Sequence, residues 1–213
     1  LGFTFQEDNV AVEFGVPPAA SLKEFQKNIK AVQKRFLKDH KHLTFSKLSA
    51  VVFPDSEMTH PMAHIFGCEP DFDAWTGEIN KKPQPPVPNL RSAGGHVHIE
   101  TQLDVREVMK GCDTVLGVAS TLMDKGQLRK QLYGKRGAYR PKPYGGEYRV
   151  LSNFWIFDDK KVAWIWRGVE RALSMVKQGV NFNEYDVPIA QAINEGNKEV
   201  ASSLVKHFNL ELV

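Results

Sequence analysis

The residues best placed by type and spacing to do chemistry lie in the run RSAGGHVHIE, residues 91–100. Gly94 and Gly95 let the backbone turn sharply or approach a ligand closely. His96 and His98 then alternate with apolar residues, so in a strand both imidazoles would share one face. Such a pair on an open face suits a metal or phosphate site. The alternative is an exposed strand whose polar positions happen to be histidine.

A second chemically informative region spans residues 126–155. Its first part, residues 126–146, mixes glycines and tyrosines with six basic residues: Arg129, Lys130, Lys135, Arg136, Arg140 and Lys142. Guanidinium forks and backbone N–H groups in such a loop can hold phosphates. Glu147 and Arg149 follow at a spacing that places them on one strand face, which favours a nucleotide site. The alternatives are a solvated basic loop and a single-strand nucleic-acid patch.

Carboxylates near the amino terminus could add to such a site. Residues 6–16 alternate in polarity and predict a strand, which Pro17 and Pro18 end. Glu7 and Glu13 are an even number of residues apart, so an unbroken strand would place them on one face. Ordinary solvent-facing carboxylates are the alternative. A later loop, residues 66–77, holds further acids that could bind a cation without following the calcium-loop spacing: Glu69, Asp71 and Asp73.

Strands and helices must position these residues. Ser21 and Glu24 form a capping box that predicts a helix to about His40, with a lysine-rich face that we interpret as solvated surface. A strand is predicted over residues 48–53. Further helices are predicted over residues 113–123, 162–178 and 199–208 and from Asp186, with Asp104 or Asp113 as caps. The helical carboxy-terminal third carries no catalytic signal and reads as core and support.

The amino-acid composition limits the classes of protein to which this chain can belong. The chain has 213 residues, of which 42% are hydrophobic and 25% charged, as in one globular domain. The net charge of +3 gives no electrostatic case for nucleic acid. Two cysteines, Cys68 and Cys112, form no disulfide framework, so free thiols in a reducing cytoplasm are expected. No apolar run approaches the roughly 20 residues that a membrane span needs.

Four motifs taken in order carry a family resemblance: EDNVxVEF, RxAGGHVHI, YGxxGxYR and GxEYRxL. Together they resemble the phage-type COOH–NH2 ligases, a branch of the glutamine synthetase and γ-glutamylcysteine ligase superfamily. The resemblance covers roughly residues 3–155 and is followed by a helical tail of the kind that this family carries. It implies one α+β catalytic domain over residues 1–213, with the sheet and site in 1–160 and helices in 161–213. The implied sheet is curved, mainly antiparallel and lines an active-site funnel, with helices on its outer face.

The resemblance also implies a reaction. The family joins a carboxylate to an amine, using ATP and Mg2+, with Mn2+ as a substitute, through an acyl phosphate. The implied metal ligands are Glu7, Glu13, His96 and Glu147, and the implied catalytic residues are Glu147, Arg149 and His96. The implied nucleotide- and phosphate-binding residues are His98, Arg91, Arg140 and Arg136. The substrates would be a small-molecule or peptide carboxylate and an amine, with no membrane or nucleic-acid partner.

One departure from the family pattern concerns the metal site. The superfamily carries an early strand with a G-x-E/D-x-E acidic pair, which this sequence lacks, and we expect it upstream of residue 1. Two alternatives to the ligase stay open: a guanidino-kinase-like phosphotransferase, and an inactive relative that binds a nucleotide, nucleic acid or protein. A cytoplasmic location is expected, in the host if the gene is phage-encoded, and homo-oligomers are compatible with the sequence.

Overall fold

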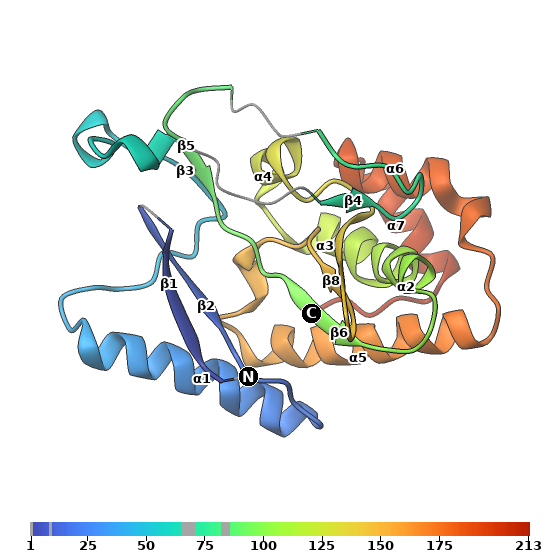
Figure 1. Ribbon diagram of the computed structural model, residues 1–213. Coiled ribbons are helices and arrows are strands. Elements are labelled where there is room, and N and C mark those ends of the chain that lie inside the picture. The colour runs from blue at the N-terminus through green and yellow to red at the C-terminus, as the bar shows by residue number, and fades with distance from the viewer. Residues whose placement is uncertain (1, 9, 65–70, 82–85) are drawn as a thin grey trace.

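The computed structural model describes residues 2–8, 10–64, 71–81 and 86–213 (Figure 1). Its strands are β1 (Thr4–Asp8), β2 (Ala11–Gly15), β3 (Ala50–Val52), β4 (Phe72–Asp73), β5 (Leu90–Ser92), β6 (Val97–Glu100), β7 (Ala138–Lys142) and β8 (Gly145–Tyr148). Its α-helices are α1 (Leu22–Asp39), α2 (Val105–Cys112), α3 (Val118–Met123), α4 (Gln127–Leu132), α5 (Asp159–Lys177), α6 (Asp186–Asn194) and α7 (Lys198–His207). Short 3-10 turns are η1 (Asp55–Glu57), η2 (Pro61–His64), η4 (Asn153–Trp155) and η5 (Phe182–Tyr185), and η3 (Asp113–Gly117) is a π-helical turn.

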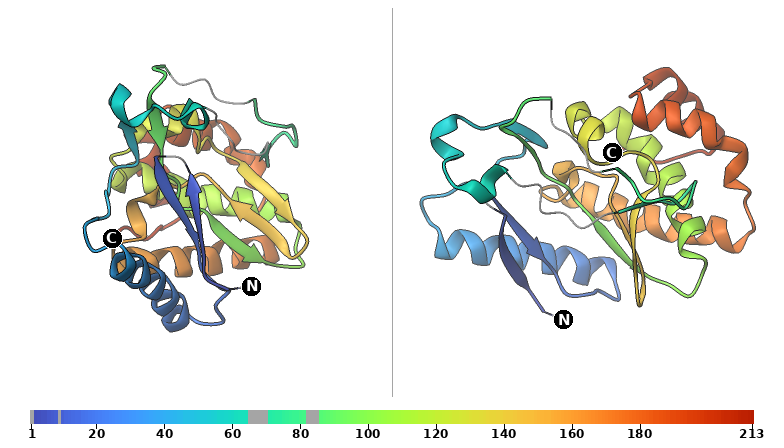
Figure 2. Two further views of the ribbon diagram at one scale, coloured as in Figure 1. Left: turned by 60° about the vertical axis from the view of Figure 1, so that its left-hand side comes forward. Right: turned by 45° about the horizontal axis from the view of Figure 1, so that its top comes forward.

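The described strands form three antiparallel sheets. β1 pairs with β2, β3 pairs with β5, and a four-stranded sheet has the order β4-β7-β8-β6. The mixed α and β composition and the antiparallel pairing were both predicted. The described strands do not form one continuous sheet, because the β1–β2 hairpin and the β3–β5 pair form sheets of their own (Figures 1 and 2).

The amino-terminal strand prediction is also wrong. Residues 6–16 are divided between β1 and β2, which pair so that Glu7 lies opposite Val12 and Glu13 lies opposite Gln6. Opposite residues share a face and neighbours alternate, so Glu7 and Glu13 lie on opposite faces of the hairpin. Alternating polarity continues through such a hairpin, and for that reason the pattern resembled one longer strand.

Helix α1 begins where the capping box predicts. The backbone N–H of Glu24 donates to Ser21 Oγ over 3.3 Å, and the carboxylate of Glu24 accepts from Ala20 N over 2.9 Å. Its inner face buries Ile29 and Val32, and α1 packs against the start of α5 (Figure 1). Phe25 adds an aromatic contact, with its ring centroid 6.1 Å from that of Trp155. The predicted helix is therefore confirmed.

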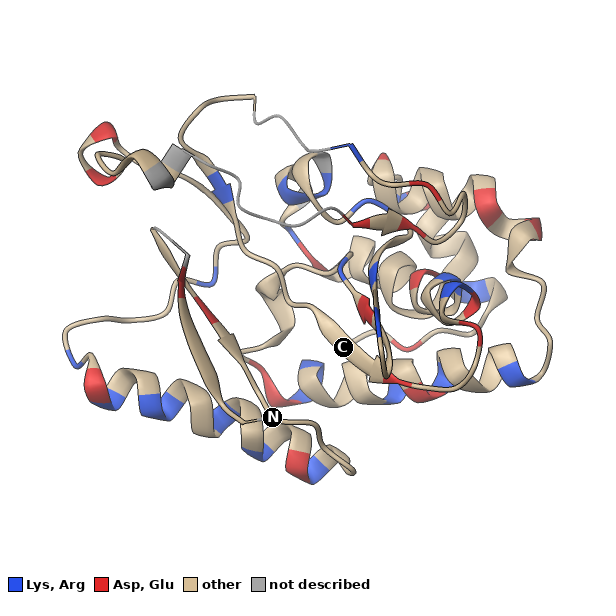
Figure 3. Ribbon diagram, viewed as in Figure 1, with Lys and Arg blue, Asp and Glu red and all other residues tan. Residues whose placement is uncertain are grey.

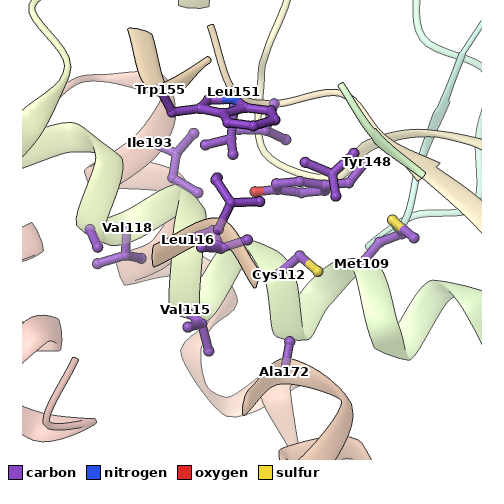
Figure 4. Packing of buried hydrophobic residues seen from close by; sticks show 14 of the residues in the cluster. Met109, Cys112, Val115, Leu116, Val118, Tyr148, Leu151, Trp155, Ala172 and Ile193 are labelled. Atoms are coloured by element: carbon purple, nitrogen blue, oxygen red, sulfur yellow. The ribbon is translucent and has the colours of Figure 1, made fainter. Parts of the chain in front are cut away.

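The main core lies between the four-stranded sheet and helix α2. Tyr148 from β8 and Met109 from α2 point into it, together with Leu116 and Trp155 (Figure 4). Gly146 allows the close approach of sheet and helix, because a Cβ at this position would lie 2.7 Å from a methyl group of Met109 and of Val105. One face of the sheet is thus apolar and covered.

Helices α2 and α3 are joined through η3 into one continuous helical run. Asp104 caps its start by accepting from Arg106 N and Glu107 N, as predicted. The prediction of a cap at Asp113 is wrong, because Asp113 lies inside the run at the start of the π turn. Its fully buried carboxylate instead accepts hydrogen bonds from three groups of the surrounding fold: Trp75 Nε1 at 2.7 Å, Tyr148 Oη at 2.8 Å and Gly137 N at 2.5 Å.

The carboxy-terminal part is helical, as predicted, in α5, η5, α6 and α7. Asp158 caps α5 and Asn197 caps α7 with side-chain oxygens. Asp186 was predicted as the cap of α6 but is its first residue, one position further along the chain. Within the described ranges, no helix combines the length and apolarity that crossing a membrane requires.

Candidate functional site

The face of the four-stranded sheet that points away from α2 collects the polar residues. The strand register sets His98 of β6 and Arg140 of β7 on either side of Glu147 of β8. Directly opposite residues share a sheet face, and so do residues two apart along a strand. His96, Lys142 and Arg149 therefore join the same face. We call this group the polar cluster: His96, His98, Arg140, Lys142, Glu147 and Arg149.

Glu147 is the centre of the polar cluster and is only 4% exposed. Its Oε1 forms an ion pair with Arg149 Nη1 and lies 3.2 Å from His96 Nδ1. Its Oε2 lies 3.2 Å from Lys142 Nζ and 4.0 Å from Arg140 Nη1. Burial alone would raise the pKa of Glu147, but the hydrogen bond with His96 and the charge of Arg149 outweigh it and hold this pKa well below its usual value. The carboxylate is therefore ionised at neutral pH.

His96 is held neutral by its surroundings. Burial, and then the positive charges of Arg149 and Arg129, lower its pKa to about 4, although the hydrogen bond with Glu147 acts in the opposite direction. Its Nδ1 lies 3.2 Å from both Glu147 Oε1 and Arg149 Nη1. A neutral imidazole can donate to the carboxylate in one tautomer or accept from the guanidinium in the other.

His98 lies at the exposed edge of the polar cluster. Its Nδ1 is 2.6 Å from the hydroxyl of Tyr144, which belongs to the turn between β7 and β8. Burial lowers the pKa of His98, and Glu147 acts against this shift. The sequence did not single out Tyr144, because a tyrosine in a turn carries no spacing signal.

Arg149 is fixed on two sides. Besides its ion pair with Glu147, its Nε lies 3.2 Å from Asp71 Oδ2. Asp71 was considered as a cation ligand together with Glu69 and Asp73. In the structure Asp73 accepts from Trp75 N in a turn, and Glu69 lies outside the described residues. Asp71 thus forms an ion pair with Arg149, and no residue spacing in the sequence indicated this contact.

The two glycines before His96 have a packing role. A Cβ at Gly95 would lie 2.3 Å from Trp155 Nε1 and 2.6 Å from the Ser152 carbonyl oxygen. A Cβ at Gly94 would lie 2.4 Å from the imidazole of His96. We expected these glycines to let the backbone approach a ligand closely. Instead they let it approach other parts of the protein, where η4 meets the start of β6.

Two predicted phosphate-binding residues lie outside the polar cluster. Arg91 of β5 donates from Nε to the Ala63 carbonyl and from Nη1 to the Pro88 and Leu90 carbonyls. Arg136 forms an ion pair with Asp186 of α6 at 2.9 Å and lies over the Trp75 ring, with 5.0 Å between Cζ and the ring centroid. Both guanidinium groups connect parts of the fold.

Of the four predicted metal ligands, His96 and Glu147 lie together, and Glu7 and Glu13 lie elsewhere. Glu7 and Glu13 are exposed on the separate hairpin β1–β2. Among the described residues, no three His, Cys, Asp or Glu side chains come together in a group that could hold a metal ion. Both oxygens of Glu147 already contact cationic side chains. The described residues therefore do not fit a resident metal site, although Mg2+ that enters with substrate phosphates needs only one or two carboxylates.

The structure thus defines a mixed α and β protein with a buried, ionised carboxylate amid basic side chains on one sheet face. A family model described as phage phiEco32-like COOH.NH2 ligase-type 2 matches residues 86–212, more than half of the chain. The chain belongs to this family of COOH–NH2 ligases, as its motifs predicted. The match includes the whole polar cluster and begins after α1 and β3. No curated protein and no solved structure matches the chain.

Proposed function

We propose that this protein is an ATP-dependent ligase that forms an amide or peptide-like bond between a carboxylate and an amine. The substrate carboxylate would attack the γ-phosphorus of ATP and release ADP, which gives an acyl phosphate. The amine would then attack the acyl carbon, and inorganic phosphate would leave. The family supports the bond type, and the basic side chains around Glu147 support a site for anionic reactants.

The observation that carries the proposal is the pairing of Glu147 with several cationic groups on one sheet face. A buried anion fixes the side chains of Arg149 and Lys142, so their charges are preorganised before substrate binds. In the proposed site Arg149 and Arg140 stabilise the phosphoryl group that is transferred. Fixed positive charge is the main requirement of such a transfer, since the charge on the phosphoryl oxygens must be balanced.

The remaining side chains of the polar cluster have supporting roles in this proposal. His98, oriented by Tyr144, contacts the nucleotide at the exposed edge of the sheet. Neutral His96 accepts or donates a hydrogen bond beside Glu147 without adding charge. Mg2+ would arrive bound to the phosphates of ATP. The metal-ligand roles of Glu7 and Glu13, and a funnel like that of glutamine synthetase, stay predictions.

A substrate-dependence assay with Glu147→Gln tests the proposal. Glutamine keeps the shape but removes the charge that organises Arg149 and Lys142, so we expect at least a hundredfold lower rate of ADP formation. Glu78→Gln is the control, because Glu78 is exposed and lies outside the polar cluster. ADP formation must require both a carboxylate and an amine. Unchanged activity of Glu147→Gln would refute the site, and a phosphorylated product formed without amine would indicate a phosphotransferase.

A further inference from the structure

Positive charge is concentrated in a segment near the amino terminus, in addition to the basic region of residues 126–155. Residues 22–47 contain eight Lys and Arg residues and two acidic residues, which gives this segment a net charge of +6. The whole chain has 28 basic and 25 acidic residues, so the remainder carries −3. The total of +3 therefore conceals a strongly basic region. All eight basic side chains are exposed, and on the α1 ribbon acidic residues occur only near the two ends (Figure 3).

Five of these lysines form one row on α1, which we call the lysine stripe: Lys23, Lys27, Lys30, Lys34 and Lys38. At about 100° per residue they fall within an arc of about 80°, opposite the face that buries Ile29 and Val32. The row is about 22 Å long at 1.5 Å per residue. The acidic residues Glu24 and Asp39 of α1 lie outside this arc.

The charges of the lysine stripe are largely uncompensated. Lys30 pairs with Asp159 at 2.5 Å, but both side chains are more than half exposed, so the pair is weak. Within the part of the chain that the structure describes, the other four lysines form no ion pair. Lys41 and Lys47 continue the basic surface beyond the helix. A stripe of this kind attracts an extended polyanion.

The packing of α1 and the residue types of the lysine stripe limit which polyanions it could bind. Its apolar face is occupied by α5 and by aromatic contacts, including Phe36 with Phe5 at 5.9 Å, so it cannot insert into a lipid surface. The lysine stripe has no aromatic residue on which unpaired bases could stack. It also has no Arg, Asn or Gln to read base edges, because Gln26 and Gln33 lie outside the arc and donate to backbone carbonyls near the start of α5.

We propose that the lysine stripe of α1 is a docking surface for the phosphate backbone of double-stranded DNA, without base specificity. Lysines act as point charges for phosphates, and a straight row of one sign matches the regular charge of a duplex strand. The surface lies before the region that matches the ligase family, and no residue of the polar cluster belongs to it. DNA binding is therefore a property beyond the proposed ligase activity.

Fluorescence anisotropy with a labelled 20-base-pair duplex, over a series of NaCl concentrations, tests this proposal. The variant K27Q/K34Q/K38Q removes three charges of the lysine stripe and leaves the Lys30–Asp159 pair intact. The matched control K177Q/K198Q/K206Q removes three exposed charges from α5 and α7. We expect the slope of log Kd against log salt to become shallower by about 2 to 3 for the stripe variant only, since each lost phosphate contact contributes about 0.9. Its affinity at low salt should fall at least tenfold.

Three outcomes would overturn the proposal. Equal losses in the two variants would mean that only net charge matters. Failure of the unmodified protein to bind the duplex would exclude the surface altogether. Tighter binding to anionic vesicles or to polyglutamate than to the duplex, at the same salt concentration, would assign the stripe to another partner. Circular dichroism verifies that the variants fold, and ligase assays on them separate this proposal from the proposed function, because neither variant alters the polar cluster.

Discussion

At the scale of single residues, Glu147, predicted as a catalytic residue and metal ligand, lies at the centre of a group of cationic side chains. One of its oxygens contacts Arg149 and His96, and the other contacts Lys142. The two-residue spacing of His96 and His98, and of Glu147 and Arg149, indicated shared strand faces in the sequence. Arg140 was predicted from the family resemblance instead, and Lys142 follows it within a segment that was predicted as a loop. Asp71 and Tyr144 come from loops whose course no periodicity reveals.

Arg149 offers a test of what a buried ion pair contributes here. Its guanidinium reaches Glu147 and Asp71 at once from a 5% exposed side chain. Lysine keeps the charge but cannot hold both carboxylates, so Arg149→Lys should lower the free energy of unfolding by about 2 to 3 kcal/mol. The measurement is urea denaturation followed by circular dichroism.

The matched control for this substitution is Arg167→Lys on the surface of α5. Arg167 also contacts a carboxylate with two nitrogens, but it and its partner Glu211 are about half exposed. Water and salt screen such a pair, and its replacement should change the free energy of unfolding by less than about 1 kcal/mol. If the two variants lost equal stability, Arg149 would not be an anchored member of the polar cluster.

At the scale of elements, the sequence predicted most helices and the strands that carry His98 and Glu147, but not how the strands assemble. The segment predicted as a basic loop contains helix α4 and strand β7. Capping residues such as Ser21, Asp104 and Asn197 act through neighbouring backbone groups, so local sequence determines these helix starts. The division of residues 6–16 into a hairpin, and the separation of three sheets, depend on contacts between distant segments. Polarity patterns do not record such contacts, and this is why the face of Glu13 relative to Glu7 was predicted wrongly.

The turn between β7 and β8 depends on two adjacent glycines with different requirements. Gly145 has a φ of 147°, and a Cβ there would lie 2.2 Å from the Ile99 carbonyl oxygen. Gly146 has an ordinary φ, and a Cβ there would meet side-chain methyl groups at 2.7 Å. Side chains can move away from an added Cβ, whereas the backbone carbonyl beside Gly145 cannot. Gly145→Ala should therefore lower the unfolding free energy by about 2 kcal/mol or more, and Gly146→Ala by roughly half as much. Thermal and urea unfolding of the two variants would compare them, and an equal or reversed order would contradict this account.

At the scale of the whole molecule, Asp113 connects four segments. Its carboxylate joins η3 to Trp75 after β4, to Gly137 before β7 and to Tyr148 of β8. Burial raises the pKa of Asp113 to about 7, against the hydrogen bonds from Trp75, Tyr148 and Gly137 that favour its charged form. The folded protein therefore retains a proton that the unfolded chain releases near pH 3.8.

This difference predicts a pH dependence of stability. For a carboxyl whose folded pKa is raised, the stabilising contribution is complete below pH 3.8 and is lost as the pH rises towards 7. His96 has the opposite effect. Because its pKa is lowered from 6.5 to about 4, its contribution makes the unfolding free energy rise as the pH increases from about 4 to 6.5. The unfolding free energy of Asp113→Asn, subtracted from that of the unmodified protein, isolates the first effect. The difference should shrink as pH rises from 5 to 7.5, and pH-independent differences would refute it.

The π turn η3 also restricts where the length of this chain can vary. A π turn holds one residue more than an α-helical turn, and the extra residue sets the rotation of α3 relative to α2. Deleting one residue between 113 and 117 would restore a regular helix and would rotate everything after it by about 100°. Val118 and Ala119, now buried, would turn away from the core. A one-residue deletion in this helix would therefore disturb the fold more than the loss of several residues from an exposed loop.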